Sequence, residues 1–435
     1  MDKNEMIKKL QNGNFDSAFR LLYGESAVEH QRNRYLTAIE KFSEIFPKRE
    51  DIHIFSAPGR SEVCGNHTDH QHGCVLAAAV NLDVIAVVSF HKDNIINLKS
   101  EKYPMINISL DDLSVHEEEK GKSMSIVRGI AARFHEMGVN ISGFDAYTTS
   151  DVLSGSGLSS SAAFEILVGT IIDKHYNNGK AGAVEIAKIG QYAENEYFGK
   201  KSGLMDQMVS SVGNFVFIDF ADVDNPYVES VPFNFENVGY SLCITDTKGS
   251  HANLTPDYVA VPTEMNSVAK QFGKSCLREV DENEFMDSIP SLREKCSDRA
   301  IIRAAHFFGE NRRAKEAASF LKNNDFNMFL NIIRESGNSS AKWLQNLYSC
   351  SDPLQQGITL ALMESEQILG SKGVSRVHGG GFAGTIQAFV PTAMTEEYCR
   401  KMDGIFGKGS CYVLRIRPVG GVEITEYTEG KSCEF

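Results

Sequence analysis

The chain has 435 residues, of which 42% are hydrophobic and 23% are charged, and its formal net charge is -13. This balance is typical of a folded protein and excludes a disordered one. The acidic charge, without a basic block, argues against nucleic acids and anionic membranes as partners, although a few local cations can still hold an anionic substrate. A chain of this length is expected to form two domains.

No targeting segment is evident in the sequence. The first residues, MDKNEMIKKLQNGNFDSAF, lack the apolar core of a signal peptide. The longest apolar runs, such as Val84 to Val88, have the length of strands rather than of membrane spans. We therefore expect a cytoplasmic protein. Its nine cysteines are scattered without a CxxC pair, so we expect most of them to be reduced small hydrophobes rather than zinc ligands.

The pattern of apolar residues predicts helices and strands in irregular alternation. Apolar residues at helical spacing predict helices over most of residues 1–47, and a turn follows at Ala57-Pro58-Gly59. Because regular strand–helix–strand units are missing, the pattern favours the α+β class, with a domain boundary near residue 220. In chain order, strands are expected at 52–55, 75–80, 84–90, 106–110 and 144–149, helices at 158–176 and 183–197, strands at 215–220 and 242–245, mostly helices over 256–370, and strands at 385–390 and 412–417.

A glycine-rich segment, LSGSGLSSSAAFE, covers residues 153–165 at the start of an expected helix. Glycines let the backbone approach a ligand closely, and the first turn of a helix offers free N–H groups and the positive end of the dipole. The segment therefore predicts a phosphate site, with an ordinary Ser/Gly loop as the alternative. It is not a GxxxxGK[ST] loop, and no G-x-G-x-x-G follows a clear strand.

A dense polar cluster covers residues 57–73, APGRSEVCGNHTDHQHG. Such a density of hydrogen-bonding side chains suits a sugar, whose hydroxyls must be paired when they leave water. His67, Asp69, His70 and His72 offer a metal site as an alternative, although their spacing matches no standard zinc pattern. A solvated polar turn is the third interpretation.

A second glycine-rich segment and two acids complete the set of candidate functional residues. Residues 373–385, GVSRVHGGGFAGT, permit close approach of backbone to a ligand. Asp206 follows Gly203, and Glu194 lies on an expected helix. Phosphoryl transfer to a hydroxyl requires a carboxylate near the attacking oxygen, a cation and Mg²⁺ on the phosphates, although either acid alone is also compatible with a surface role.

Together, the three segments resemble those of the GHMP kinase superfamily and, within it, the galactokinases, from about residue 30 to the C-terminus. The resemblance implies a two-domain fold: residues 1–220 form a domain like ribosomal protein S5 domain 2, and residues 221–435 form the C-terminal GHMP kinase domain with a ferredoxin-like core. It implies phosphorylation of galactose by ATP at the anomeric hydroxyl, giving galactose 1-phosphate and ADP, with Mg²⁺.

The resemblance also implies roles for individual residues. Asp206 matches the catalytic aspartate, and Arg60 matches the arginine that stabilises it. The remaining matches are Asn66, His67, Asp69, Gly203 and Tyr258 for the sugar, Gly155, Ser156, Gly157, Leu158, Ser159, Ser160 and Ser161 for ATP, and Ser161 and Glu194 for Mg²⁺.

The sugar motif departs from the usual family pattern. The usual sequence is GRVNLIGEHTDYNGG, whereas this chain has GRSEVCGNHTDHQHG. Asn66 replaces a glutamate that faces the C6 end of the sugar, and an amide does not repel an anion. The DHQ of residues 69–71 also resembles the plant galacturonokinase pattern. A galactose altered at C6, such as galacturonate, is therefore an alternative substrate.

The acceptor and the catalytic ability of the chain each have a further interpretation. The acceptor could be N-acetylgalactosamine, or the chain could be a non-catalytic sensor of galactose and ATP built on the same fold. The presence of Asp206, Arg60, Ser161 and Glu194 favours an enzyme over a sensor. A metalloenzyme using the histidine-rich turn is the third class of function.

Overall fold

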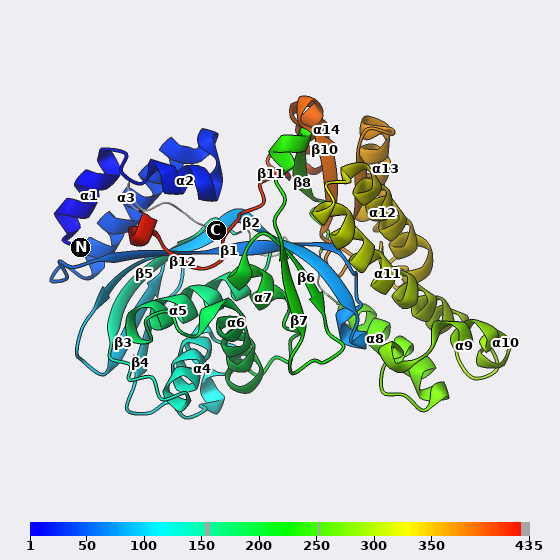
Figure 1. The fold of residues 1–435 in the computed structure, drawn as a ribbon, viewed down its shortest axis with the longest axis horizontal. Coiled ribbons are helices and arrows are strands. Elements are labelled where there is room, and N and C mark those ends of the chain that lie inside the picture. The colour runs from blue at the N-terminus through cyan, green and yellow to red at the C-terminus, as the bar shows by residue number, and fades with distance from the viewer. Residues whose placement is uncertain (153–156, 251–252, 428–435) are drawn as a thin grey trace.

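The structure, a computed structural model, describes residues 1–152, 157–250 and 253–427. Within these residues the strands form two sheets, one of eight strands and one of four. Helices cover both faces of the larger sheet, and the smaller sheet lies with a separate group of helices in the other half of the molecule (Figure 1). None of the helices in the described ranges is long and apolar enough to cross a membrane.

The large sheet is built around two long neighbouring strands, β1 (His53–Cys64) and β2 (Cys74–Phe90). Its main path runs β12-β1-β2-β5-β3-β4, while β6 pairs with the first part of β2 and β7 pairs with β6. Its described pairings are antiparallel except for β3 with β5. The other strands are β3 (Ile95–Ser100), β4 (Met105–Ser109), β5 (Phe144–Ser150), β6 (Phe215–Asp219), β7 (Tyr227–Val231) and β12 (Val422–Glu423).

The turn predicted at Ala57-Pro58-Gly59 was wrong, because β1 runs through these residues. The pairing of β1 with β2 shifts register between Pro58 and Arg60, and such a bulge tolerates a residue that has no N–H to donate. Gly59 also permits a close approach, since a Cβ there would lie only 2.7 Å from the carbonyl oxygen of Leu158. At the bulge, β1 therefore packs directly against the first glycine-rich segment.

Three N-terminal helices cover one face of the large sheet: α1 (Lys3–Gln11), α2 (Asp16–Tyr23) and α3 (Val28–Ile45) (Figure 1). Their buried side chains form one apolar cluster with Ile85 and Val87 of β2. The helices predicted within residues 1–47 are thus confirmed, and they form part of the core rather than a free extension.

The opposite face of this sheet carries α4 (Ser123–Glu136), α5 (Ser160–Tyr176), α6 (Gly182–Tyr192) and α7 (Met205–Val212). A π-helical stretch, Ala193–Phe198, continues α6. Both α5 and α7 pack on β1 and on each other. The first residues of these two helices and the bulge of β1 together form the candidate site.

The small sheet contains β8 (Tyr240–Asp246), β9 (Val374–His378), β10 (Thr385–Pro391) and β11 (Cys411–Leu414) in the order β11-β8-β10-β9. Helices connect β8 to β9 and β10 to β11, which is the split βαββαβ arrangement of ferredoxin-like folds. The helices of this half are α8 (Thr255–Ala269), α9 (Glu282–Asp287), α10 (Ile289–Leu292), α11 (Asp298–Lys322), α12 (Phe326–Ser339), α13 (Gly357–Leu369) and α14 (Thr395–Phe406).

The chain leaves the large sheet later than the boundary expected near residue 220, because β7 still pairs with β6. After β11 it returns, since Ile416 bridges to Val80 and β12 pairs with β1. The large-sheet half therefore comprises residues up to β7 together with the C-terminal return. Sequence patterns alone do not reveal this return of the C-terminal residues, because it depends on contacts between segments far apart in the chain.

Candidate active site

Arg60 and Asp206 form an ion pair where the bulge of β1 meets the start of α7. Nε of Arg60 lies 2.7 Å from Oδ1 of Asp206, and the Ser159 hydroxyl donates to Oδ2 at 2.6 Å. Burial alone raises the pKa of Asp206, but the Arg60 charge and the hydrogen bonds from Arg60 and Ser159 outweigh it and lower the pKa below its usual value. With 34% of its side chain exposed, Asp206 is an ionised carboxylate that a ligand can reach.

The glycine-rich segment turns into α5 directly beside this pair. Ser159 precedes the helix with a left-handed φ of 55°, and its hydroxyl bonds Asp206 instead of capping α5. Arg60 holds the segment through its guanidinium, which donates to the Gly157 carbonyl, and through its own N–H, which donates to the Leu158 carbonyl at 3.0 Å. The first turn of α5, at Ser160, thus presents N–H groups suited to an anion.

Two of the predicted phosphate-loop residues, Gly155 and Ser156, lie outside the described residues. The described part of the loop begins at Gly157. A Cβ on Gly157 would lie 3.2 Å from Nδ1 of His378, so the loop meets the second glycine-rich segment across the site.

Two predicted sugar residues, Asp69 and Gly203, lie next to each other. A Cβ on Gly203 would lie 3.2 Å from Oδ2 of Asp69, and Gly203 is three residues before Asp206. Both residues are at least partly exposed. Polar groups of the sugar motif therefore face solvent beside the turn that leads into Asp206.

Asn66, also predicted to contact the sugar, is fully buried and bonded within the protein. Its amide nitrogen donates to Oε1 of Glu62 at 2.9 Å and to the Gly379 carbonyl at 2.8 Å. Its amide oxygen accepts from Nδ2 of Asn346 at 2.8 Å. Asn66 thus ties the polar segment to the second glycine-rich segment.

The partner of Asn66 explains the unusual motif. Glu62 occupies the position where the usual motif has asparagine, and Asn66 the position where it has glutamate. The two residue types are exchanged, and their side chains bond each other. Burial raises the pKa of Glu62, opposed by attraction to Arg376, whose Nη2 lies 3.5 Å from Oε1 of Glu62.

The second glycine-rich segment forms the facing wall. His67 bonds the Gly380 carbonyl through Nε2 at 2.9 Å, and the Tyr258 hydroxyl donates to the Gly381 carbonyl at 2.9 Å. A Cβ on Gly380 would lie 2.7 Å from the Tyr258 ring. Gly157, Tyr258 and residues of 378–385 line one cavity, so the two glycine-rich segments meet there.

The predicted metal ligands, Ser161 and Glu194, come from two separate elements. Glu194 is buried in the π-helical stretch, where it accepts from Nζ of Lys200 at 2.9 Å and from Nε2 of Gln207 at 3.0 Å. Ser161 is exposed in the first turn of α5. Glu165, which lies four residues after Ser161 on α5, also accepts from Nε2 of Gln207, at 2.9 Å, and so shares this donor with Glu194.

Sequence reasoning missed Glu165 as a site residue. Burial, and then repulsion from Glu194, raise its pKa to about 8, so the carboxyl is largely protonated at neutral pH. The available signal was its spacing from Ser161, because residues four apart share a helix face.

The histidine-rich turn does not assemble a metal site. His67 is bonded to a backbone carbonyl, and His70 is about half exposed. In the described parts of the chain, the group of three His, Cys, Asp or Glu ligand atoms within 4.8 Å of one another is formed by Cys243, Cys399 and Cys411, far from this turn in sequence. The alternative of a metalloenzyme built on the turn therefore receives no support from the geometry.

Comparisons with known proteins agree with the site. Residues 40–90 match the model of the galactokinase galactose-binding signature, and residues 125–214 match that of the GHMP kinases N terminal domain. The chain is 31% identical over 371 residues to a galactokinase of Actinobacillus pleuropneumoniae serotype 5b, covering 83% of this chain and 91% of that protein. The chain belongs to the galactokinase family. A galactokinase of Bacillus subtilis is 27% identical over 369 residues, covering 83% of this chain and 90% of that protein.

Solved structures share the fold of this galactokinase-family chain. The crystal structure of Lactococcus lactis galactokinase complexed with galactose superposes with a TM-score of 0.75 at 24% identity, covering 89% of this chain and 100% of that one. A mevalonate kinase gives a TM-score of 0.60 at 14% identity, covering 83% and 98%. The predicted two-domain GHMP kinase fold is confirmed, and family membership makes the chain an ATP-dependent sugar kinase.

Proposed function

We propose that this kinase acts in the cytoplasm and transfers the γ-phosphoryl group of ATP to the anomeric hydroxyl of galactose, giving galactose 1-phosphate and ADP. The observation that carries the proposal is the pair of Arg60 and Asp206, with a carboxylate that is ionised, accessible and set beside the start of α5. The sugar hydroxyl and the γ-phosphate of ATP can therefore both be held next to the Asp206 carboxylate.

Each group would act on a defined part of the reaction. Asp206 accepts or orients the proton of the attacking hydroxyl, and Arg60 keeps Asp206 ionised while offsetting the negative charge that develops. The N–H groups at the start of α5 and the Ser160 hydroxyl bind phosphate oxygens. Because phosphoryl transfer involves little bonding chemistry by the protein, positioning and charge neutralisation account for most of the acceleration.

The oxygen groups near α5 fit Mg²⁺, a hard cation that prefers oxygen ligands. Ser161 and Glu194 would hold it, with Glu165 behind them sharing the amide of Gln207. When bound, Mg²⁺ neutralises charge on the phosphates of ATP. The amide of Gln207 orients the carboxyl groups of Glu165 and Glu194 whether or not Mg²⁺ is bound.

Galactose is the first candidate acceptor. Although Glu62 and Asn66 are exchanged relative to the usual motif, the pair still contains one carboxylate and one amide. Asp69 and Gly203 lie at the accessible side of the site, whereas Asn66 is occupied by protein partners. Galacturonate is the second candidate, favoured by the amide at position 66 and by the pairing of Glu62 with Arg376, which reduces repulsion of an anion.

A panel of acceptors tests the proposal. ADP release by the purified protein with Mg²⁺ and ATP would be compared for galactose, N-acetylgalactosamine, galacturonate, glucose and arabinose. The proposal expects galactose to have the highest kcat/KM. Turnover confined to galacturonate would replace galactose by the second candidate, and turnover of none of the five would overturn the assignment of the acceptor.

A further inference from the structure

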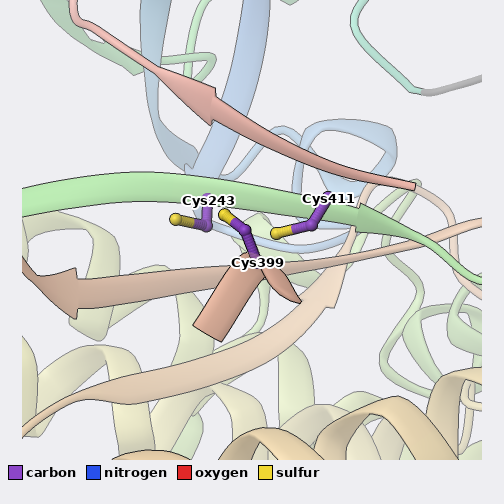
Figure 2. A group of neighbouring side chains, drawn as sticks. All are labelled: Cys243, Cys399 and Cys411. Atoms are coloured by element: carbon purple, nitrogen blue, oxygen red, sulfur yellow. The ribbon is translucent and has the colours of Figure 1, made fainter. Parts of the chain in front are cut away.

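Three cysteines from separate segments meet at the small sheet, and none of them lines the cavity of the kinase site. Cys243 lies on β8, Cys399 on α14 and Cys411 at the start of β11. Their sulfur atoms all lie within 4.8 Å of one another. Figure 2 shows the Cys399 side chain rising from its helix to the strand that carries Cys243, with the sulfur of Cys411 turned toward the same place.

The sheet register accounts for this meeting. Val413 of β11 pairs with Cys243 of β8, and Cys411 pairs with Thr245. Residues two apart on a strand share a face, so Cys411 and Cys243 are diagonal neighbours on one face of the sheet. Helix α14 packs on both strands, and Cys399 projects from it toward the sheet.

The three thiols adjoin an otherwise largely apolar cluster: Cys243 is one of its buried members, and Cys399 and Cys411 pack against it. Cys243 is fully buried, whereas Cys399 and Cys411 are partly exposed, which gives an ion a route from solvent. The hydroxyl of Thr245, opposite Cys411, is also fully buried and has the Cys411 thiol and the Tyr398 hydroxyl as its polar neighbours. A metal-bound thiolate at Cys411 would be a stronger acceptor for this buried hydroxyl than a neutral thiol.

The chemistry of three clustered thiols is specific. Thiolates bind soft d¹⁰ cations, and sulfur atoms sharing one Zn²⁺ lie about 4 Å apart when each Zn–S bond is about 2.3 Å. The described cysteines form no disulfide, so all three sulfurs are free to act as ligands. We propose that Cys243, Cys399 and Cys411 bind a thiophilic d¹⁰ cation, either Cu⁺ in a three-sulfur site or Zn²⁺ with water as the fourth ligand.

Such a site would stabilise the small-sheet half just before the chain returns to the large sheet. The cation would join α14 to β8 and β11, and after β11 the chain returns to the large sheet through Ile416 and β12. Since a ligand that binds only the folded state stabilises it by mass action, the metal would raise the melting temperature without contacting the kinase site.

The test uses the full-length reduced protein and the metals themselves. Zn²⁺ binding would be measured by competition with a chelator, Cu⁺ binding by anaerobic competition, and Co²⁺ would report thiolate ligation by its sulfur-to-metal charge-transfer absorption. Cys399→Ser and Cys411→Ser are the principal variants because both positions are partly exposed. Cys350→Ser is the matched control, since Cys350 is exposed, free and outside the group.

The proposal expects one metal ion per chain in the wild type and in Cys350→Ser, with a thiolate band for Co²⁺ and a raised melting temperature with the bound metal. Each principal variant would lose affinity by at least about 10- to 100-fold, since even loss of an outer-shell partner costs that much. The metal that binds more tightly to the wild type identifies the cation. Equal affinity of wild type and Cys399→Ser, or a disulfide within the group in protein purified without oxidant, would overturn the proposal.

Discussion

The side-chain amide of Asn66 donates a 2.9 Å hydrogen bond to the carboxylate of Glu62, and both residues are buried. These are the two positions at which the sugar motif exchanges asparagine and glutamate relative to its usual form. The exchange moves the negative charge by four residues along the chain while keeping one amide and one carboxylate in contact. We therefore expect a substitution at position 66 to act through the pair rather than through Asn66 alone.

Asn66→Glu is expected to destabilise the protein, because it places two carboxyl groups together in a buried network. We expect the free energy of unfolding to fall by about 1–3 kcal/mol. The double variant Glu62→Asn with Asn66→Glu should recover part of this loss, which a double-mutant cycle from denaturant unfolding measures. Strict additivity of the two single changes would show that the pair is not coupled.

Glu165 should make the stability of the metal-free protein depend on pH. Burial raises its pKa from 4.5 to about 8, so the folded state holds a proton that the unfolded state releases near pH 4.5. The stabilisation is fully present below pH 4.5, declines as pH rises and is lost above about pH 8. Glu165→Gln should flatten this part of the melting-temperature profile, whereas Glu196→Gln, at an exposed position, should leave it unchanged. Identical profiles for wild type and Glu165→Gln would contradict the assignment.

Gly380 should tolerate no side chain, because a Cβ would lie 2.7 Å from the Tyr258 ring and displace it from the site wall. We expect Gly380→Ala to lower kcat/KM for the sugar by roughly 10-fold or more, as small misplacements near a site commonly do. Gly404→Ala is the matched control, since nothing lies within 4 Å of a Cβ at that position in α14. It should leave the kinetics unchanged and stabilise the helix by about 0.5–1 kcal/mol. Unaltered steady-state kinetics in Gly380→Ala would show that the segment around Gly380 is not part of the active site.

Asp83 should be the most sensitive charge in the interface with the N-terminal helices. It lies 2.7 Å from Nη1 of Arg34 in α3 and 3.0 Å from Nη1 of Arg417 in the C-terminal return, and it accepts from Tyr23. Asp83→Asn leaves two buried guanidinium groups poorly paired and should cost about 3–5 kcal/mol of stability. Asp298→Asn breaks an exposed pair with Arg293 and should cost less than about 1 kcal/mol. Comparable losses in the two variants would argue against this network.

The resemblance predicted that Arg60 stabilises Asp206, but not the route by which the two residues meet. Asp206 and Arg60 were assigned from motifs 146 positions apart, and the structure places them in contact. The turn at Ala57-Pro58-Gly59 was mispredicted because local signals for Pro and Gly are the same in a turn and in a bulge. Only the pairing with β2 distinguishes the two.

Several further features depend on long-range contacts that no local pattern encodes. The bonding of Asn66 to Asn346, the pairing of β7 and the return of residues after β11 each join distant segments. The cysteine group depends most completely on such long-range contacts. Cys243, Cys399 and Cys411 have no metal-binding spacing in the sequence, and only the strand register and α14 bring them together.

The most direct test of the proposed mechanism is turnover by Asp206→Asn, measured as sugar phosphate and ADP formed from galactose and ATP, beside nucleotide affinity from calorimetry. An asparagine keeps the shape of Asp206 but cannot accept the proton of the hydroxyl. We predict that kcat falls by on the order of 10²–10⁴ while the affinity for ATP stays within about twofold. Near-normal turnover in this variant would contradict the proposed mechanism and remove Asp206 from the role of base.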